Sequence, residues 1–386
     1  MTSMRQFLRY TLILILFSIP YKSHAETINV ERGLWVVRHE ITTPESIDSL
    51  IAIASRYRFT DIFVQIRGRG DAYYNSAYEP KAEELNSDFD PLKYLIEKKQ
   101  GHTFRIHAWI NVFYLWSSEN PPIAKNHIVN QKPDWIAYPM EIPSDSSLFE
   151  RRGDSEGLFA SPLLPEVQKH ILNVLNDILS HYEIDGLHLD YIRFPGSDFD
   201  FHPWVRHQFR KLYILDPLEF ENDKEKFVQK YGYTGYELYY SRWTRFLRNG
   251  LSDFVKTLSQ NVRKKNPDII ISAAVKADLS MAYFSYYQEW DRWLKEGWID
   301  RAVPMNYTNN NVTFLSRIRS MLNSGLMNKL WIGISLYNQS ELAVLEKIRA
   351  VQELSLNGFV LFSYKQFKQN KNLQRLYIQE VSTKKG

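Results

Sequence analysis

The sequence predicts an α/β protein of the (β/α)8 class, a TIM barrel with long loops after strands 3 and 4 on the C-terminal face. Eight short β-rich runs alternate with longer amphipathic segments along the 386 residues. Several of these runs are almost continuously apolar, as parallel strands are when helices cover both faces. No repeat or linker divides the chain, so we expect one barrel over residues 30–380.

The segments between the strands carry recognisable helix boundaries. The segment at 44–58 has helical spacing and begins with Pro44, and the segment at 90–101 stops at Gly101. A long helix at 165–184 leads directly into "DGLHLDYIRFP", where a β-type apolar run surrounds Asp190. The eight strands are expected at 33–38, 61–71, 104–113, 185–195, 268–278, 299–307, 330–337 and 358–364.

Two segments make the chain longer than the roughly 250 residues typical of this barrel. Residues 114–164, rich in Pro, Ser and Trp, follow the third strand, and residues 196–240, with a Tyr-rich stretch, follow the fourth. Both leave from the C-terminal ends of strands, where such barrels keep their active sites. We therefore expect both segments to roof the C-terminal face.

The first 25 residues have the pattern of an export signal. Arg5 and Arg9 precede a short apolar run at 11–20, and Ser23 and Ala25 are small residues at the positions that a signal peptidase reads. We expect cleavage after Ala25 and a secreted or periplasmic protein with no membrane span after cleavage. An uncleaved N-terminal anchor is the alternative.

Composition excludes several kinds of site. A chain without cysteine has no disulfide, thiolate nucleophile or Cys-based zinc site. The net charge of +4 falls to +1 without Arg5, Arg9 and Lys22, and no basic patch indicates nucleic acid. No HExxH, GxSxG, Walker or dinucleotide pattern is present, so neither a metal nor a cofactor is expected. Aromatic residues, at 15%, fit either a sugar-binding surface or an aromatic core.

Polar residues gather where the predicted strands end. In a barrel these ends meet at one mouth although they lie far apart in sequence, so we expect a single site there. Asp190 and Asp278 are the expected catalytic carboxyls. The expected substrate-binding residues are Arg67, Asp71, His107, Trp109, Asn111, His188, Arg193, Asn306, Tyr307 and Tyr364. Strand ends also carry Arg38, Glu40, Gln65 and Lys276.

Asp190 has two possible roles. Burying an unpaired carboxylate is unfavourable, so Asp190 either lies at the rim of a pocket and does chemistry or pairs with Arg193 or Arg67. In the catalytic interpretation, Asp190 attacks the anomeric carbon or stabilises charge there. Arg67 and His188 would keep it ionised, and His188 shares its face of the strand.

Glycoside hydrolysis usually needs a second carboxyl as the general acid. Asp278 is favoured because it ends the strand next to that of Asp190. Asp71, after a Gly-rich turn, and Glu289, within a helical segment, are the other candidates. The separation of the two carboxyls would distinguish retention from inversion of configuration.

Five motifs together resemble one known family. "RGLWVVR", "VQIRGRGDAYYNSAYEP", "FDPLKYLIEKKQGHTFRIHAWINVF", "DGLHLDYIRFPG" and "WIDRAVPMNY" are similar to the bacterial glycosyl hydrolase-like family ten. The resemblance spans residues 31–365. It implies an exported barrel acting on a polysaccharide, with Asp190 as the catalytic carboxylate. Many members have an Asp pair at this point, where this chain has Tyr191 after Asp190.

The expected function is therefore an exported glycoside hydrolase that cleaves a polysaccharide or oligosaccharide. A carbohydrate-binding barrel of the cell envelope without turnover is the alternative. A structural cell-envelope protein is a third possibility, and it would have no cleft at the strand ends.

Overall fold

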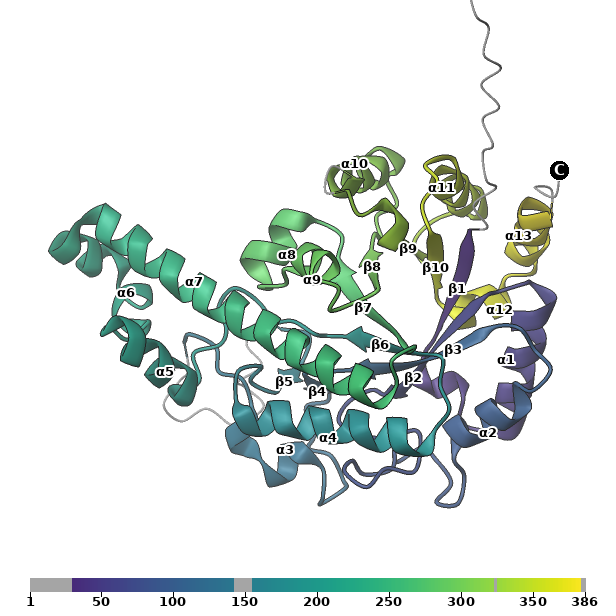
Figure 1. Cartoon of the computed structure of the whole chain (residues 1–386), viewed down its shortest axis with the longest axis horizontal. Coiled ribbons are helices and arrows are strands. Elements are labelled where there is room, and N and C mark those ends of the chain that lie inside the picture. The colour runs from purple at the N-terminus through teal and green to yellow at the C-terminus, as the bar shows by residue number, and fades with distance from the viewer. Residues whose placement is uncertain (1–29, 142–154, 323–324, 383–386) are drawn as a thin grey trace, which may run out of the picture.

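The computed structural model describes residues 30–141, 155–322 and 325–382. Eight parallel strands close into a barrel in the order β1-β10-β9-β8-β7-β6-β3-β2, with helices packed around it (Figure 1). All eight predicted strands are confirmed. They are β1 (Glu31–Val36), β2 (Asp61–Arg67), β3 (Arg105–Asn111), β6 (Gly186–Asp190), β7 (Ile270–Lys276), β8 (Arg301–Met305), β9 (Trp331–Ser335) and β10 (Gly358–Phe362).

Local sequence signals set the helix starts. Thr43 caps α1 by accepting a hydrogen bond from the backbone of Ser46, and Pro44 occupies the first turn. Asp90 caps α2 in the same way. The helices are α1 (Pro44–Arg56), α2 (Pro91–Lys98), α3 (Ile128–Gln131), α4 (Pro165–His181), α5 (Pro203–Tyr213), α6 (Leu218–Glu221), α7 (Lys224–Lys265), α8 (Leu279–Ser285), α9 (Trp290–Lys295), α10 (Asn311–Leu322), α11 (Glu341–Glu353), α12 (Tyr364–Gln369) and α13 (Lys371–Ser382). Short 3-10 turns are η1 (Arg38–Glu40), η2 (Pro133–Trp135) and η4 (Met327–Lys329).

Large side chains fill the inside of the barrel. The buried inner cluster consists of Trp35, Phe63, Trp109, Val303, Trp331 and Val360. These residues come from six of the eight strands and occupy the space that a pore would need. A second, much larger core lies between the outer faces of the strands and the surrounding helices. The inner cluster thus forms a solid floor beneath the C-terminal mouth.

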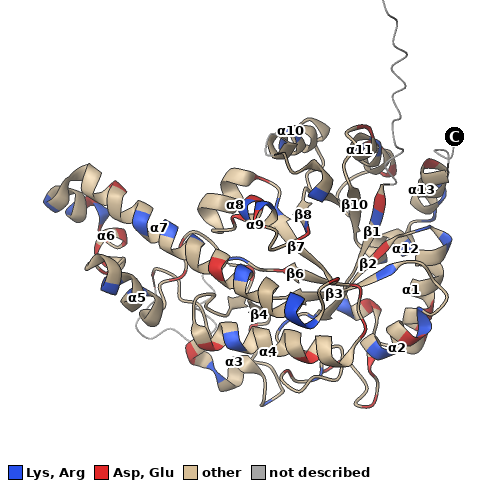
Figure 2. Ribbon diagram, viewed as in Figure 1, with Lys and Arg blue, Asp and Glu red and all other residues tan. Residues whose placement is uncertain are grey.

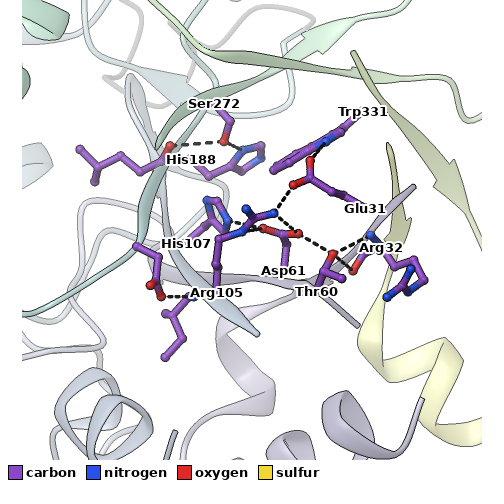
Figure 3. Close-up of polar contacts among 12 residues, drawn as sticks. Glu31, Arg32, Thr60, Asp61, Arg105, His107, His188, Ser272 and Trp331 are labelled. Carbon is purple, nitrogen blue, oxygen red and sulfur yellow. Dashed lines mark hydrogen bonds and ion pairs between the residues drawn. The ribbon is translucent and has the colours of Figure 1, made fainter. Parts of the chain in front are cut away.

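A partly buried polar network closes the other end of the barrel (Figure 3). Arg105 forms ion pairs with Glu31 (2.5 Å) and Asp61 (2.6 Å), the first residues of β1 and β2. Asp61 also contacts Nε2 of His107 at 2.8 Å. Because these groups stand at the N-terminal ends of the strands, they lie far from the mouth. His107 therefore belongs to this structural network and not to the expected substrate site.

The segment after β3 is more ordered than the sequence suggests. Strands β4 (Tyr114–Trp116) and β5 (Leu158–Phe159) pair as a small antiparallel sheet within it. Gly157 permits this close pairing, because a Cβ atom there would lie 2.3 Å from the carbonyl oxygen of Trp116. This sheet brings the far end of the segment back over the barrel. Residues 142–154 lie outside the described residues.

The segment after β6 forms helices and not the expected roof. Helices α5, α6 and the start of the 42-residue α7 build an arm that projects away from the barrel (Figure 1). Gly232, with φ +77°, interrupts α7 near its start. Aromatic residues hold the arm together, as in the contact of Phe209 with Trp243, whose ring centroids are 5.1 Å apart. The Tyr-rich and Phe-rich sequence packs largely against itself, so the expectation that this segment covers the mouth is wrong.

The outer surface carries a mixture of charges. Lys and Arg are interspersed with Asp and Glu over the helices (Figure 2), in line with the small net charge. Among the described helices, none combines the length and the apolar character needed to cross a membrane. The expected export signal at 1–25 lies outside the described residues.

Candidate active site

A cavity of about 450 Å³ opens at the C-terminal ends of the barrel strands. Seven of the eight strands, or the residues that follow them, contribute to its wall, and the segment after β3 adds three residues. Its lining consists of Trp35, Val37, Arg38, Gln65, Arg69, Trp109, Asn111, Tyr114, Ser117, Glu156, Asp190, Tyr191, Arg193, Lys276, Met305, Tyr307 and Phe362. The convergence of strand ends expected from the sequence is thus present, and the arm contributes nothing to it.

Asp190 lies in this cavity as the last residue of β6. Its Oδ1 accepts a hydrogen bond from the backbone N–H of Tyr191 at 2.7 Å, and Tyr191 takes a left-handed conformation with φ +50°. Burial raises the pKa of Asp190 to about 6, although this backbone hydrogen bond and the charge of Arg193 act in the opposite direction. Asp190 therefore takes up a proton at mildly acidic pH, above the usual range of an aspartate.

Glu156 is the second carboxyl in the cavity. It accepts hydrogen bonds from the hydroxyl of Tyr191 at 2.6 Å and from Nη2 of Arg193 at 3.1 Å. Its side chain is 53% exposed, so burial disfavours its charge only in part, and Arg193, the Tyr191 hydroxyl and Lys276 lower the pKa of Glu156. Tyr191 thus contacts both carboxyls, one through its backbone and the other through its side chain, while their pKa values are displaced in opposite directions.

Two cations stand beside these carboxyls. The guanidinium of Arg193 lies 4.8 Å from the ring centroid of Tyr191 and 4.7 Å from that of Tyr286. Lys276 ends β7, and its ammonium lies 4.2 Å from the same Tyr286 ring. Burial and the charge of Arg193 lower the pKa of Lys276 to about 8. In the part of the chain that the structure describes, the ion pair of Arg193 is with Glu156, and Asp190 has none.

An aromatic wall faces the carboxyls. The rings of Tyr307 and Phe362 are stacked, with centroids 5.5 Å apart and planes at 22°. Trp35 meets both rings edge-on at about 6 Å. Trp109, on the neighbouring side, donates from Nε1 to Oδ1 of Asn111 at 3.0 Å. A cavity that combines flat apolar rings with a few fixed polar groups suits a sugar, which has apolar ring faces and polar edges.

The structure divides the expected site residues into two groups. Five of the twelve line the cavity: Trp109, Asn111, Asp190, Arg193 and Tyr307. The other seven lie outside its lining: Arg67, Asp71, His107, His188, Asp278, Asn306 and Tyr364. Each of these seven has contacts elsewhere that explain its position.

Arg67 is a structural residue. Its Nη2 forms a fully buried ion pair with Glu79 at 2.7 Å, and its Nη1 donates to the backbone carbonyl of Asn111. The ladder between β2 and β3 changes register at this point, so Arg67 pairs with Ile110, which faces the outer core. The expected ion pair of Arg67 with Asp190 is therefore absent from the described structure.

His188 cannot hold Asp190 ionised. Its Nε2 accepts from Nε1 of Trp35 at 3.0 Å. Its Nδ1 lies 2.9 Å from the hydroxyl oxygen of Ser272 (Figure 3). Complete burial lowers its pKa well below the usual value, so the ring is neutral. A strand rises about 3.3 Å per residue, which places His188 roughly 7 Å below Asp190 in the barrel.

The remaining expected residues serve local structure. Asp71 accepts from the backbone N–H of Arg69 at 2.8 Å. Asn306 donates to the carbonyl of Phe314 at 3.0 Å, and the hydroxyl of Tyr364 donates to Ser49 at 3.3 Å. Glu289, the third candidate acid, accepts from the hydroxyl of Ser252 at 3.1 Å and pairs with Arg292.

Asp278 caps helix α8. Its Oδ1 accepts from the backbone N–H of Met281 at 3.0 Å, and the chain has already turned away from the mouth two residues after β7 ends. The expectation that Asp278 faces Asp190 across the cavity is not met. Within the described residues, Glu156 occupies the place of the second carboxyl.

Asp278 should accordingly matter for stability and not for turnover. Asp278→Ala removes an N-cap and should lower the free energy of unfolding by about 1 kcal/mol. Because its side chain lines no part of the cavity, the expected glycan hydrolysis should proceed at the rate of the wild type. Urea denaturation and initial rates on the same preparations check both statements. A large loss of turnover in a fully folded variant would restore Asp278 as the general acid.

Several cavity residues were not assigned to the site from the sequence. Arg38, Gln65 and Lys276 stood out only as polar strand ends, and no pattern distinguished Arg69 from other loop cations. Glu156 lies 34 positions before Asp190 in a long connection and carries no motif. Only the β4–β5 pairing, which folds that connection back, brings Glu156 to Arg193 and Tyr191.

The described residues contain no group of three or more His, Asp or Glu side chains placed to hold a metal ion.

Comparisons with known proteins agree with this architecture. The model of the family described as glycosyl hydrolase-like 10 matches residues 27–335. Among curated proteins, glycosyl hydrolase YngK of Bacillus subtilis is 21% identical over 326 residues, which cover 75% of this chain and 56% of that protein. Glycosyl hydrolase DigH of Escherichia coli K12 is 21% identical over 329 residues, which cover 75% and 65%. The chain thus spans between 56% and 65% of the length of these two relatives.

Solved structures share the fold. The glycoside hydrolase domain of PgaB (BpsB) from Bordetella bronchiseptica superposes with a TM-score of 0.67 at 12% identity, covering 90% of this chain and 98% of that domain. At this identity the likeness concerns the barrel alone.

Proposed function

This chain belongs to the glycosyl hydrolase-like 10 family, and on that premise we propose that it is an exported glycoside hydrolase that cleaves a polysaccharide or oligosaccharide. One observation carries the proposal. Two carboxyls, Asp190 and Glu156, share a cavity at the mouth of the barrel and have pKa values displaced in opposite directions. Opposite pKa shifts keep one carboxyl protonated and the other ionised, which is what the hydrolysis of a glycosidic bond by an acid and a carboxylate requires.

Asp190 is the general acid in this proposal. Its pKa of about 6 leaves a substantial protonated fraction at mildly acidic pH, and the cause is burial at the base of the cavity. A protonated Asp190 can donate to the glycosidic oxygen as the bond to the leaving sugar breaks. The sequence suggested the reverse, an ionised Asp190 acting as nucleophile, because Arg67 and His188 were expected to stabilise its charge.

Glu156 supplies the ionised carboxylate. Arg193 and the hydroxyl of Tyr191 hold its oxygens and keep it charged. A carboxylate in this state can attack the anomeric carbon or activate a water for that attack. The aromatic wall of Trp35, Tyr307 and Phe362 would hold the sugar ring against the two carboxyls. Tyr191 links the two carboxyls, because its backbone N–H donates to Asp190 and its hydroxyl donates to Glu156.

The pH dependence of turnover should report these two groups. The active form needs Asp190 protonated and Glu156 ionised, so kcat/KM should fall as pH rises through about 6. It should also fall at low pH, as Glu156 takes up a proton below the usual range of a glutamate. Initial rates on one glycan from about pH 2.5 to about pH 8.5 measure both limbs.

One variant tests whether Asp190 causes the fall in kcat/KM at high pH, which is the basic limb of the pH profile. The charge of Lys276 holds the pKa of Asp190 down, so Lys276→Met should move that limb to higher pH. Two results would contradict the assignment of the acid to Asp190. One is a kcat/KM that rises to a plateau above pH 7, and the other is a basic limb that lies at the same pH in Lys276→Met as in the wild type.

The direct test is a screen of purified protein against a panel of bacterial and plant polysaccharides. Release of reducing ends by the wild type, and its absence with Asp190→Asn, would support the hydrolase. Binding by both proteins without any product would favour a carbohydrate-binding barrel instead. A protein that neither binds nor cleaves any glycan would contradict both.

A further inference from the structure

The cavity carries more positive than negative charge. Four cations line it, namely Arg38, Arg69, Arg193 and Lys276, against the two carboxyls of Asp190 and Glu156. Arg193 is neutralised by its ion pair with Glu156. Lys276 lies close enough to both carboxyls for their charges to act on it. Arg38 and Arg69 remain, and neither forms an ion pair with any carboxylate that the structure describes.

Arg38 is held in place by neutral contacts. It follows β1, and its Nη1 donates to Oε1 of Gln65 at 3.0 Å. Its side chain lies across Gly68, where a Cβ atom would come within 2.5 Å of Cδ of Arg38. Its Nε is buried and has no hydrogen-bond partner among the described residues. The guanidinium is thus fixed in orientation with part of its donor capacity unused.

Arg69 follows β2 and is placed in a similar way. Its guanidinium lies 4.2 Å from the ring centroid of Trp116, and its Nε is also buried without a described partner. The backbone around it is tied down, because its N–H donates to Asp71 and its carbonyl contacts His127 at 2.7 Å. Stacking on an indole orients a guanidinium without neutralising it.

The two arginines face the same part of the cavity. The strands β1, β2 and β3 are neighbours in the barrel, and they are followed by Arg38, Arg69 and Tyr114. Burial and the charge of Glu156 raise the pKa of Tyr114, whereas the charges of Arg38 and Arg69 oppose this rise. Both arginines therefore lie on the side of the cavity that holds Tyr114, whose hydroxyl also contacts the backbone of Glu156. The two carboxyls and the other two cations belong to β6, β7 and the loop that ends in β5. The cavity therefore has one side for the reaction and an adjacent cationic side.

We propose that Arg38 and Arg69 form a subsite for a carboxylate on the glycan, so that the substrate of this site is an acidic polysaccharide or oligosaccharide. Both guanidinium groups line the cavity without a carboxylate partner among the described residues, so an anion there can pair with their terminal nitrogens. A carboxylate fits two fixed guanidinium forks better than a hydroxyl does, because it can accept several charge-assisted hydrogen bonds in one plane. The identity of the ligand as a glycan rests on the proposed function, whereas the preference for an anion rests on these contacts.

Binding measurements separate this proposal from catalysis. Asp190→Asn protein, which should not consume its ligand, is applied to an array of neutral, uronate-containing and sulfated oligosaccharides. The dissociation constants of the best binder of each class are then measured by calorimetry. The tightest binder should contain a uronate. In the same background, Arg38→Gln with Arg69→Gln should weaken it by about tenfold or more and leave neutral sugars unchanged.

Two further variants act as controls. Arg56→Gln removes a cation from the exposed face of α1 and should change nothing. Arg38→Lys keeps the charge but loses the fork, so its effect should fall between those of the wild type and the double variant. Circular dichroism and thermal unfolding establish that each variant is folded.

Each contrary outcome has a defined meaning. Equal affinity for neutral and uronate sugars, unchanged affinity in the double variant, or no binding of any uronate would overturn the subsite. Tighter binding of a sulfated oligosaccharide than of a uronate-containing one would overturn the assignment of the subsite to a carboxylate. If the selectivity for acidic sugars holds while wild-type protein hydrolyses none of them, the proposed hydrolase fails and the subsite survives.

Discussion

Replacing Asp190 with Asn is expected to lower kcat on a natural glycan by about a thousandfold, within the range that a positioned general acid contributes. Asn has nearly the same shape, and its amide oxygen can still accept the backbone hydrogen bond of Tyr191 that Asp190 accepts at 2.7 Å. It cannot give up a proton to a leaving sugar. The fold and the affinity for the glycan should therefore survive while turnover is lost.

The choice of substrate tests the role of Asp190 more finely. An aryl glycoside with a good leaving group needs little protonation, so Asp190→Asn should lose much less activity on it than on a natural glycan. Parallel assays on both substrates, with calorimetry for binding, measure this difference. Equal losses on the two substrates would mean that Asp190 acts at the anomeric carbon, as the sequence first suggested. In that case Glu156 would be the candidate for the acid.

Arg67→Met should produce the largest loss of stability. Among the described side chains, the substitution leaves buried Glu79 with His170, whose Nε2 lies 2.9 Å from Oε1, and the backbone carbonyl of Asn111 loses a donor. Removing one member of a fully buried ion pair costs about 3–5 kcal/mol, because the other charge remains without compensation. Urea denaturation monitored by tryptophan fluorescence measures the change in the free energy of unfolding.

A double variant tests whether the loss of stability comes from the uncompensated charge of Glu79. Arg67→Met combined with Glu79→Leu replaces both charges by apolar groups, and it should recover much of the stability that the single variant loses. The glycan affinity of the folded protein should be close to that of the wild type in both variants. A stable Arg67→Met protein with lost glycan affinity would instead show that Arg67 contacts substrate.

The number and order of the strands could be predicted because they depend on local pattern. Apolar runs such as 185–190 and 268–278, each bounded by turn residues and separated by amphipathic segments, have few arrangements open to them. Once the barrel is accepted, the ends of the strands must converge. Trp109, Asn111, Asp190 and Tyr307 could therefore be placed at one mouth from the sequence.

Alternation along a strand indicates which face a residue takes but leaves its depth and neighbours open. His188 shares a face with Asp190, as expected, yet it lies lower in the barrel and binds Trp35. The shift in register near Gln65 and Arg67 turns Arg67 toward the outer core, and no periodicity reveals such a bulge. Asp278, two residues past β7, is already part of a helix cap.

The sequence by itself determined the fold class and placed Asp190 at the C-terminal mouth of the barrel, where the cavity opens. Only the tertiary structure decided the partner of each charge. Glu156 reaches Arg193 because two short strands far apart in sequence pair, and Arg67 meets Glu79 because a bulge turns it outward. The pKa of a carboxyl depends on burial and on charges a few ångströms away, which chain order does not specify. The assignment of acid and base therefore required the folded arrangement.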